Sequence, residues 1–324
     1  MNKRKVVITD YWYETLDEEK TVFARLEGLE LEAYHCKDED RLPELVRDAD
    51  AVIVQFAPIT RKVIESMQRC KVIVRYAIGV DNIDIAAATE RGIYVVNVPD
   101  YCIDEVSDHA IALLMALNKK LFVLNRSVHE GKWDYTVSKP LFALRGRTLG
   151  LVGFGRIPMM VAEKMRAFGM EILCYDPYIK PETASECGVE KVELDALMQR
   201  SDFISVHCPL NDETRHLIGG HELSLMKRTA FLINTARGAV VDEAALAAAL
   251  QSGAIAGAGL DVLEHEPISK GSPLLGLDNV ILTPHNGWYS EDATLALQRK
   301  VAEEAARVLE GGVPKNLVNK SLLK

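Results

Sequence analysis

Short apolar segments alternate with amphipathic segments along almost the whole chain, and this alternation constrains the fold more than any other feature. Five strands are predicted in the first part of the sequence: Lys5–Thr9, Leu29–Tyr34, Ala51–Gln55, Val72–Arg75 and Tyr94–Val98. Segments with helical periodicity lie between them, such as Leu42–Asp48 and Ile85–Arg91. Apolar strands that alternate with helices form a parallel sheet covered on both faces. The pattern therefore predicts a doubly wound α/β unit.

The same alternation starts again in the second half of the chain. Six further strands are predicted: Thr148–Val152, Glu171–Tyr175, Phe203–Val206, Ala230–Asn234, Ala256–Leu260 and Val280–Leu282. Asp242 is the predicted N-cap of a helix over Glu243–Gln251, since a carboxylate accepts from the free N–H groups of a first turn. A chain of 324 residues is long enough for two units at roughly 150 residues per domain.

The segments that connect and close the two units have a different character. Ile103–Leu124 is long, apolar and helical in period, which predicts one helix that joins the units. Residues 127–146 are polar and irregular, and are interpreted as a loop or a subunit-contact arm. Ser290–Leu309 is predicted to form a last long helix before Gly311 and Gly312.

The charge balance and the apolar runs exclude several classes of protein. With 38 Lys+Arg and 47 Asp+Glu the net charge is −9, so nucleic acid is not expected as the main partner. The longest apolar run, Ala110–Leu117, is far below the roughly 20 residues that span a bilayer. The apolar run near the N-terminus is too short for a signal peptide, so we expect a cytoplasmic protein. No two of the six cysteines form a C-x-x-C pair, and no metal site is expected.

A glycine turn supplies the first chemical signal. Gly153-Phe154-Gly155-Arg156-Ile157-Pro158 follows the strand Thr148–Val152 and opens a predicted helix. Glycines at such a turn let backbone N–H groups approach a pyrophosphate at the positive end of the helix. Pro158 replaces the third glycine of the usual fingerprint, and proline is tolerated in a first helical turn. The turn is therefore predicted to bind a dinucleotide.

Asp176 specifies which dinucleotide is expected. It ends the next predicted strand, 21 residues after Gly155. A carboxylate there accepts both ribose hydroxyls of NAD and repels the 2′-phosphate of NADP. No arginine adjoins it within Tyr175-Asp176-Pro177-Tyr178, so NAD is the predicted cofactor.

Three later strands are each followed by a charged or titratable residue. Arg237 lies in the segment after Ala230–Asn234, Glu266 in the segment after Ala256–Leu260, and His285 after Val280–Leu282. The carboxyl ends of parallel strands line the ligand crevice, so these residues can converge although they are far apart in sequence. Taken singly, each has an ordinary structural explanation: a surface ion pair for the arginine, a loop end for the glutamate and a helix cap for the histidine.

The three residue types suit the reduction of a 2-oxo acid. Hydride transfer to the ketone creates an alkoxide that needs a proton, and histidine titrates near neutrality. A glutamate on the other ring nitrogen fixes the tautomer and favours the imidazolium. An arginine can bind the carboxylate or polarise the carbonyl.

Over nearly its whole length the chain resembles the D-isomer-specific 2-hydroxyacid dehydrogenases. The resemblance is carried by the following segments: residues 75–84 (Arg-Tyr-Ala-Ile-Gly-Val-Asp-Asn-Ile-Asp), 97–99, 153–157, 234–238, 261–267 and 283–285. Residues 285–291 and 175–178 are closest to the C-terminal-binding-protein branch. The resemblance implies two doubly wound parallel-sheet domains. Residues 1–100 with 289–324 would form a flavodoxin-like substrate domain, and 101–288 a Rossmann NAD-binding domain.

The resemblance also implies roles for individual residues and a homodimer. The implied catalytic residues are Arg237, Glu266 and His285. The implied NAD-binding residues are Gly153, Phe154, Gly155, Arg156, Ile157, Asp176, Cys208, Pro209, Thr214, Thr235, Ala236, Arg237, Asp261 and His285. The implied substrate-binding residues are Arg75, Ile78, Gly79, Arg237, His285 and Trp288. Ile78 departs from the eukaryotic branch, which has a small hydroxyl residue there, so only backbone N–H contacts are expected at that position.

Two alternatives to a general 2-oxoacid reductase remain at this point. One is an NADH-sensing corepressor, which in that branch would carry a long disordered extension, whereas this chain stops at Lys324. The other is D-3-phosphoglycerate dehydrogenase, whose short forms have a similar length. Trp288 favours a substrate with an apolar end, which a phosphate would not prefer.

Overall fold

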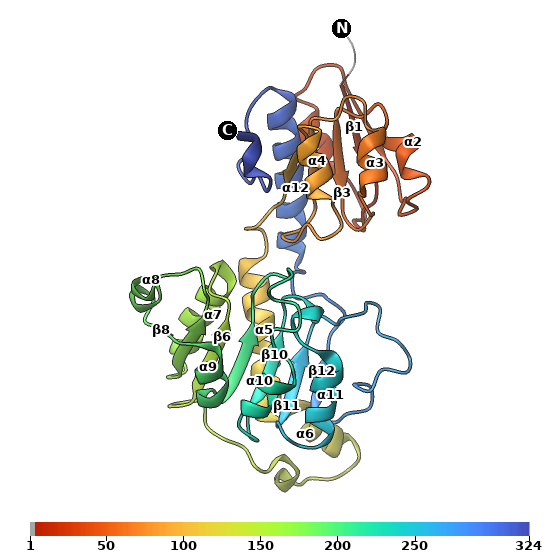
Figure 1. Cartoon of the computed structure of the whole chain (residues 1–324). Helices are drawn as coiled ribbons and strands as arrows, with labels where there is room; N and C mark the ends of the chain where they lie inside the picture. Colours follow the sequence, from red (N-terminus) through yellow and green to blue (C-terminus); the bar gives the residue numbers. More distant parts are fainter. Residues whose placement is uncertain (1–3, 324) are drawn as a thin grey trace. The chain divides into compact units, whose positions relative to one another are not determined.

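The computed structural model describes residues 4–323, and the chain divides into two compact units. Unit 1 contains Met1–Cys102 and Tyr289–Lys324, and unit 2 contains Ile103–Trp288. Each unit has one parallel sheet with helices packed against it (Figure 1). The predicted class, two doubly wound parallel-sheet α/β domains, is confirmed.

Unit 1 has a five-stranded parallel sheet in the order β2-β1-β3-β4-β5. Its strands are β1 (Arg4–Ile8), β2 (Leu29–Ala33), β3 (Ala51–Val54), β4 (Val72–Arg75) and β5 (Tyr94–Val96). Its helices are α1 (Asp17–Phe23), α2 (Leu42–Val46), α3 (Arg61–Ser66), α4 (Ile85–Glu90), α12 (Glu291–Leu309) and the 3₁₀ turn η3 (Lys320–Leu323).

Alternate residues of the central strand β3 enter two different hydrophobic clusters. Ala51 and Ile53 belong to the cluster that contains α1 and α12, whereas Val52 and Val54 belong to the cluster that contains α2, α3 and α4. Successive side chains of a strand point to opposite faces, so the sheet is buried on both sides. This double burial explains why β3 is apolar throughout, whereas the less buried edge strand β2 alternates leucine with glutamate.

Unit 2 has a seven-stranded parallel sheet in the order β12-β11-β10-β9-β6-β7-β8. Its strands are β6 (Thr148–Val152), β7 (Glu171–Tyr175), β8 (Glu190–Lys191), β9 (Phe203–Val206), β10 (Phe231–Asn234), β11 (Gly257–Leu260) and β12 (Val280–Leu282). Its helices are α5 (Ile103–Lys119), α6 (Leu121–His129), α7 (Arg156–Arg166), α8 (Pro181–Glu186), α9 (Leu194–Arg200), α10 (Gly220–Leu225) and α11 (Glu243–Gln251), with 3₁₀ turns η1 (Tyr135–Ser138) and η2 (Gly238–Val240).

The strand order of unit 2 reverses at β6. The chain passes from β6 to β7 and β8 on one side, and then returns to β9 on the other side. Ligands of open parallel sheets bind at such a switch point, outside the carboxyl ends of the strands. The predicted glycine turn follows β6, so it lies where this topology places a ligand.

The prediction of one helix over Ile103–Leu124 was wrong. Lys120 has a φ of +48°, and this left-handed residue separates α5 from α6. A left-handed residue interrupts the helical hydrogen-bond ladder, so the chain changes direction although the apolar periodicity continues. The predicted strands agree with the observed ones to within two residues at each end, and the two-residue strand β8 was not predicted.

A buried polar network ties α12 to the start of unit 1. Glu19 of α1 is fully buried, and its two oxygens accept from the Tyr76 hydroxyl at 2.7 Å and the Gln298 amide at 3.1 Å. The same amide donates to the Thr15 carbonyl at 2.8 Å. Burial raises the pKa of Glu19, and the two hydrogen bonds only partly oppose that rise.

This network makes a prediction about stability and pH. Because the native pKa of Glu19 is raised, the native state binds more protons than the unfolded state as pH rises above about 4, and stability falls. Glu19→Gln cannot ionise and so escapes this loss of stability. The free energy of unfolding of the variant minus that of wild type should therefore be larger at pH 7 than at pH 4. Chemical denaturation at both pH values measures the difference. A constant packing penalty cancels in that comparison, and the exposed Glu14→Gln provides the control. A difference between Glu19→Gln and wild type that is equal at both pH values would contradict the prediction.

Candidate active site

The turn after β6 is built to approach a ligand closely. Gly153 has a φ of +88°, and a Cβ there would lie 2.8 Å from the Cys208 backbone nitrogen, so the position requires glycine. Gly155 is the N-cap of α7, and a Cβ there would meet no atom within 4 Å. Pro158 lies in the first turn of α7, as predicted, where its missing N–H has no intrahelical partner. The free N–H groups and the positive end of this 11-residue helix suit a pyrophosphate.

Asp176 follows β7 and is held rigidly by backbone donors. Its two oxygens accept from the N–H of Phe154 at 2.9 Å and the N–H of Tyr178 at 2.8 Å. A carboxylate has further lone pairs on each oxygen, so it can still accept ribose hydroxyls. The first of these bonds joins the expected ribose site to the glycine turn.

Several other predicted cofactor residues of unit 2 lie on the loops after β9 and β10. Cys208 is buried, and the Thr214 hydroxyl donates to the Pro209 carbonyl at 2.6 Å, which closes that loop. The Ala236 N–H donates to the Asn234 side chain at 3.0 Å. The buried Thr235 hydroxyl has no hydrogen-bond partner among the described residues. This orphaned hydroxyl and the glycine turn fit a bound dinucleotide.

Glu266 and His285 form a close pair. Nδ1 of His285 lies 2.7 Å from Oε2 of Glu266, and Oε1 of Glu266 accepts from the Leu263 N–H at 3.0 Å. Burial would raise the pKa of Glu266, but the hydrogen bond and charge of His285 lower it below the ordinary value. Glu266 is therefore ionised across the neutral range. Because Nδ1 is committed to Glu266, Nε2 is the nitrogen that can exchange a proton with a substrate.

Arg237 lies on an extended segment directly after β10. The Asn234 amide donates to its carbonyl at 2.9 Å, and its guanidinium donates to the Ala236 carbonyl at 2.7 Å. At the next residue, Gly238, a Cβ would lie 1.9 Å from the Leu263 carbonyl carbon. The backbone that carries Arg237 is thus packed directly against the loop that carries Glu266.

The predicted substrate residues divide between the units. Arg75 ends β4 in unit 1, where its Nε donates to the Gln55 carbonyl at 3.2 Å and it pairs with Asp81 at 3.5 Å. Ile78 and Gly79 are half-buried in the following loop, and the Asn97 amide donates to the Ile78 carbonyl. Trp288 lies in unit 2, half-buried, and its indole N–H donates to the His285 carbonyl at 3.0 Å. Arg237 and His285 also belong to unit 2.

Sequence reasoning missed two residues in or near the proposed catalytic turn, residues 283–287, which carries His285. His109 of α5 lies 2.9 Å from the Thr283 hydroxyl, and that hydroxyl lies 2.6 Å from Asp261. The signal in the sequence was a histidine at the border between the polar start and the apolar second half of a predicted helix, which no motif explained.

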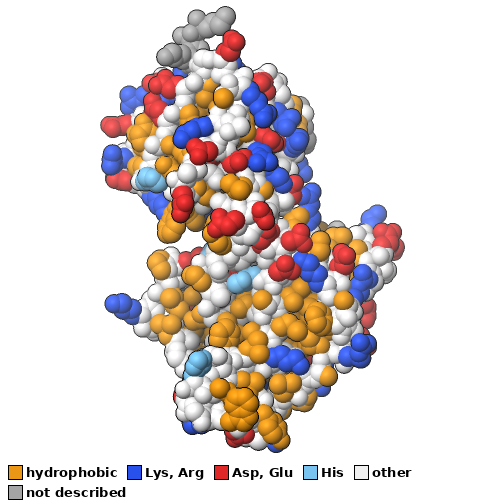
Figure 2. All heavy atoms as spheres, turned by 180° about the vertical axis from the view of Figure 1, so that it is seen from behind, with side chains coloured by type: hydrophobic (Ala, Val, Ile, Leu, Met, Phe, Trp, Pro, Cys, Tyr) orange, Lys and Arg blue, Asp and Glu red, His pale blue; other side chains and the backbone are white. Residues whose placement is uncertain are grey.

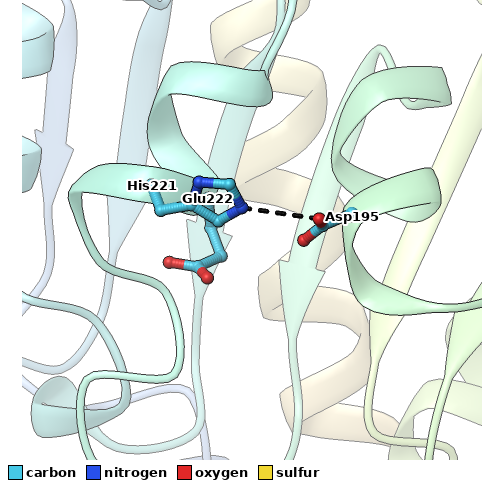
Figure 3. Close-up of side chains that lie close together, drawn as sticks. All are labelled: Asp195, His221 and Glu222. Carbon is cyan, nitrogen blue, oxygen red and sulfur yellow. Dashed lines mark hydrogen bonds and ion pairs between the residues drawn. The ribbon is translucent and has the colours of Figure 1, made fainter.

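A separate group of potential metal ligands lies on α9 and α10 (Figure 3). Nε2 of the exposed His221 lies 3.4 Å from Asp195, and the ligand atoms of Asp195, His221 and Glu222 all lie within 4.8 Å of one another. Glu222 accepts from the Gly219 N–H at 2.9 Å and so caps α10. A helix cap and a surface ion pair account for the group, and the expected absence of a resident metal stays a prediction.

Comparison with known proteins gives consistent matches. A family model described as "D-isomer specific 2-hydroxyacid dehydrogenase, NAD binding domain" matches residues 111–287. The chain is 45% identical to a glyoxylate reductase of Korarchaeum cryptofilum, over 87% of this chain and 86% of that protein. It is also 45% identical to a D-3-phosphoglycerate dehydrogenase of Methanocaldococcus jannaschii, over 87% of this chain but only 54% of that longer protein.

A solved structure matches both units. The D-lactate dehydrogenase of Aquifex aeolicus, complexed with NAD and lactic acid, has a TM-score of 0.88 and 31% identity, and the match covers 97% of this chain and 99% of that one. Within residues 4–323, no helix combines the length and hydropathy needed to cross a membrane.

The Glu266–His285 pair leads to a prediction for 2-oxo acid reduction. His285→Ala should lower kcat by about 10²–10⁴, the usual contribution of a positioned acid. Glu266→Gln should move the fall of the reduction rate at high pH to a lower pH, because a neutral amide stabilises the imidazolium less than a carboxylate does. Steady-state rates across pH 5–9 measure both effects. Near-normal turnover in His285→Ala would show that another group donates the proton.

Proposed function

The chain belongs to the D-isomer-specific 2-hydroxyacid dehydrogenase family, and we propose that it reduces 2-oxo acids with apolar or thioether ends, with Arg237, Glu266 and His285 as its catalytic residues. As a member of this family it is an NAD-dependent dehydrogenase that interconverts D-2-hydroxy acids and 2-oxo acids. The observation that carries the catalytic assignment is the Glu266–His285 pair, which holds a proton donor beside the strand ends.

The three residues supply the acid–base group and the positive charge that the reduction needs. Bound NADH would supply the hydride that reduces the carbonyl carbon of the 2-oxo acid. Nε2 of the His285 imidazolium gives its proton to the carbonyl oxygen, and Glu266 stabilises the imidazolium before transfer. Arg237 binds the substrate carboxylate or carbonyl oxygen and stabilises the negative charge that develops there. In the reverse direction neutral His285 accepts the hydroxyl proton.

The cofactor site follows from the geometry of unit 2. We propose that the turn Gly153–Ile157 contacts the pyrophosphate and that Asp176 accepts the ribose hydroxyls. The Thr235 hydroxyl, buried and unpartnered among the described residues, is available to the same cofactor. The roles of Cys208, Pro209, Thr214, Ala236 and Asp261 remain predictions from the resemblance.

Trp288 carries the proposal for the substrate. Its indole N–H is bonded to the His285 carbonyl, so the ring is tethered at the base of the catalytic turn. A flat apolar ring there favours an apolar substrate end. The substrate-binding roles of Arg75, Ile78 and Gly79 of unit 1 remain predictions from the resemblance. Glyoxylate is the second candidate because several relatives are glyoxylate reductases, and D-3-phosphoglycerate is a third on the strength of the longer relative.

We further propose that the protein is a cytoplasmic homodimer, and that residues 121–142 contribute to the dimer contact. Exposed hydrophobic side chains gather on unit 2 (Figure 2), and this segment supplies Leu121, Phe122, Val128, Trp133, Tyr135, Val137, Leu141 and Phe142. Trp133 alone is 91% exposed. Many exposed large hydrophobic side chains within one short segment are typical of a protein interface. The likeness to the C-terminal-binding-protein branch, and the corepressor role that it suggests, remain hypotheses.

The position of Asp176 predicts the cofactor preference. The catalytic efficiency with NADH should exceed that with NADPH at least about tenfold, the size of one charge-assisted contact. Asp176→Asn removes the charge and keeps one acceptor for the neighbouring N–H groups. It should therefore lower the ratio of the catalytic efficiency with NADH to that with NADPH. Initial rates with each cofactor measure it. Equal efficiency in the unmutated protein would contradict the assignment.

The position of Trp288 predicts the substrate preference. Oxo acids with apolar or thioether ends should exceed glyoxylate in kcat/KM, since each buried methylene is worth about 0.8 kcal/mol, or roughly a factor of four. Trp288→Ala should erase that preference and leave glyoxylate turnover nearly unchanged. Trp288→Phe, which keeps a flat ring but loses the N–H, should retain most of the preference for oxo acids with apolar ends. A wild-type preference for glyoxylate or phosphohydroxypyruvate over every apolar oxo acid would disprove the apolar substrate site and favour the second or third candidate.

A further inference from the structure

The backbone of the catalytic histidine is strained. His285 has a φ of +53°, in the left-handed region that residues with a Cβ avoid at a cost of about 1–2 kcal/mol. Such a conformation persists only where the surroundings impose it. The structure therefore has to contain groups that hold this turn in place.

One buried carboxylate holds most of the turn. Asp261, at the end of β11, is 3% exposed, and its two oxygens accept from the N–H of Asn286 at 3.0 Å and of Gly287 at 2.8 Å. The backbone oxygen of Asp261 accepts from the His285 N–H at 2.8 Å. Three successive N–H groups of the catalytic turn thus end on a single residue.

That carboxylate is itself held in place by a histidine on α5 and by a threonine after β12. The Thr283 hydroxyl lies 2.6 Å from Asp261 Oδ1, and His109 Nε2 lies 2.9 Å from that hydroxyl and 3.3 Å from the same Oδ1. A carboxylate only accepts, so the single hydroxyl proton of Thr283 goes to Asp261. His109 Nε2 must then carry a proton and donate.

The electrostatics of this cluster keep Asp261 charged. Burial would raise the pKa of Asp261, but hydrogen bonds from His109, Thr283 and the two backbone N–H groups lower it below the ordinary value. The packing is equally tight. A Cβ added to Gly287 would lie 2.9 Å from Asp261 Oδ2 and 3.2 Å from His109 Cδ2. The turn, the carboxylate and the imidazole therefore fit together without spare room.

We propose that His109 is a positioning residue for catalysis: through Thr283 and Asp261 it fixes the strained turn that presents His285 for proton transfer. The proposal rests on the proposed role of His285 as proton donor. It gives Asp261 a structural task in addition to the cofactor role that the family resemblance implies. His109 itself needs no contact with the substrate or the cofactor.

The kinetic test compares His109→Ala with His109→Gln. The alanine variant loses the donor, and a small displacement of the turn should lower kcat about 10- to 100-fold while the KM for the oxo acid and the Kd for NADH change less than about threefold. Glutamine places an amide N–H near the position of Nε2, so it should restore kcat to within about threefold of wild type. Asp108→Asn is the matched control, because Asp108 lies next to His109 on α5, is exposed and pairs with Lys164.

An isotope effect separates positioning from a loss of folded enzyme. With NADH deuterated at the transferred position, the isotope effect on kcat should rise in His109→Ala, because a misplaced proton donor slows the chemical step itself. A smaller fraction of active enzyme would leave the isotope effect unchanged. A drop in kcat that comes with an unchanged isotope effect, or that His109→Gln does not relieve, would overturn the proposal.

Hydrogen exchange of the protein without cofactor tests the same contact independently of activity. Backbone amides 285–287 should exchange at least about tenfold faster in His109→Ala and in Thr283→Val, while β6 and α11 stay as in wild type. The threonine variant keeps the side-chain shape and covers the case in which the alanine variant does not fold. Unchanged exchange at 285–287, or a general rise throughout unit 2, would overturn the proposal. If instead His285→Ala alone keeps normal turnover, the proposed function fails while the exchange result still stands.

Discussion

Burial of both faces of each sheet is the constraint on which the rest of this structure depends. Side chains of β3 and β10 point into hydrophobic clusters on either side, so a charged group placed within such a strand would lose its hydration without compensation. Strands buried on both faces, such as β3 and β10, therefore carry no charged residue between their ends, whereas the edge strand β2 has Glu30 and Glu32 in its interior. Because the strands are parallel, their carboxyl ends share one edge, and Asp176, Arg237 and His285 emerge along that edge of unit 2.

The same constraint explains how much could be predicted from the sequence. Apolar strands and the polar residues that follow them are local patterns, so the fold class, the glycine turn and the pairing of Glu266 with His285 were all accessible. The break at Lys120 was not, because two consecutive lysines are good helix formers and the change of direction depends on how α5 and α6 pack. Apolar periodicity reports which face of a helix is buried, but not whether the helix continues straight.

His109 shows a second limit of sequence reasoning. Its ring contacts Asp261, which lies 152 residues later in the sequence, and the spacing of the two residues does not predict that contact. A lone histidine on an apolar helix is usually a core residue satisfied by some neighbour. Here that neighbour is the carboxylate under the catalytic turn, and only the arrangement of α5 beside β11 brings them together. Contacts between distant elements, rather than motifs, decide which polar residues support a site.

Close backbone approaches give this site its rigidity. Gly238 packs against the loop of Glu266, and Gly287 packs against Asp261 and His109, so both partners of the proposed catalytic pair are held by positions where a Cβ does not fit. A contact made by a flexible side chain costs rotamer entropy. A contact made by the backbone of a glycine fixes the position of the chain without that cost. The strain at His285 is then sustained by Asp261 on the backbone side and by Glu266 on the ring side. In its proposed role as proton donor, His285 would thus be oriented before the substrate arrives, and little reorganisation would be left for the chemical step.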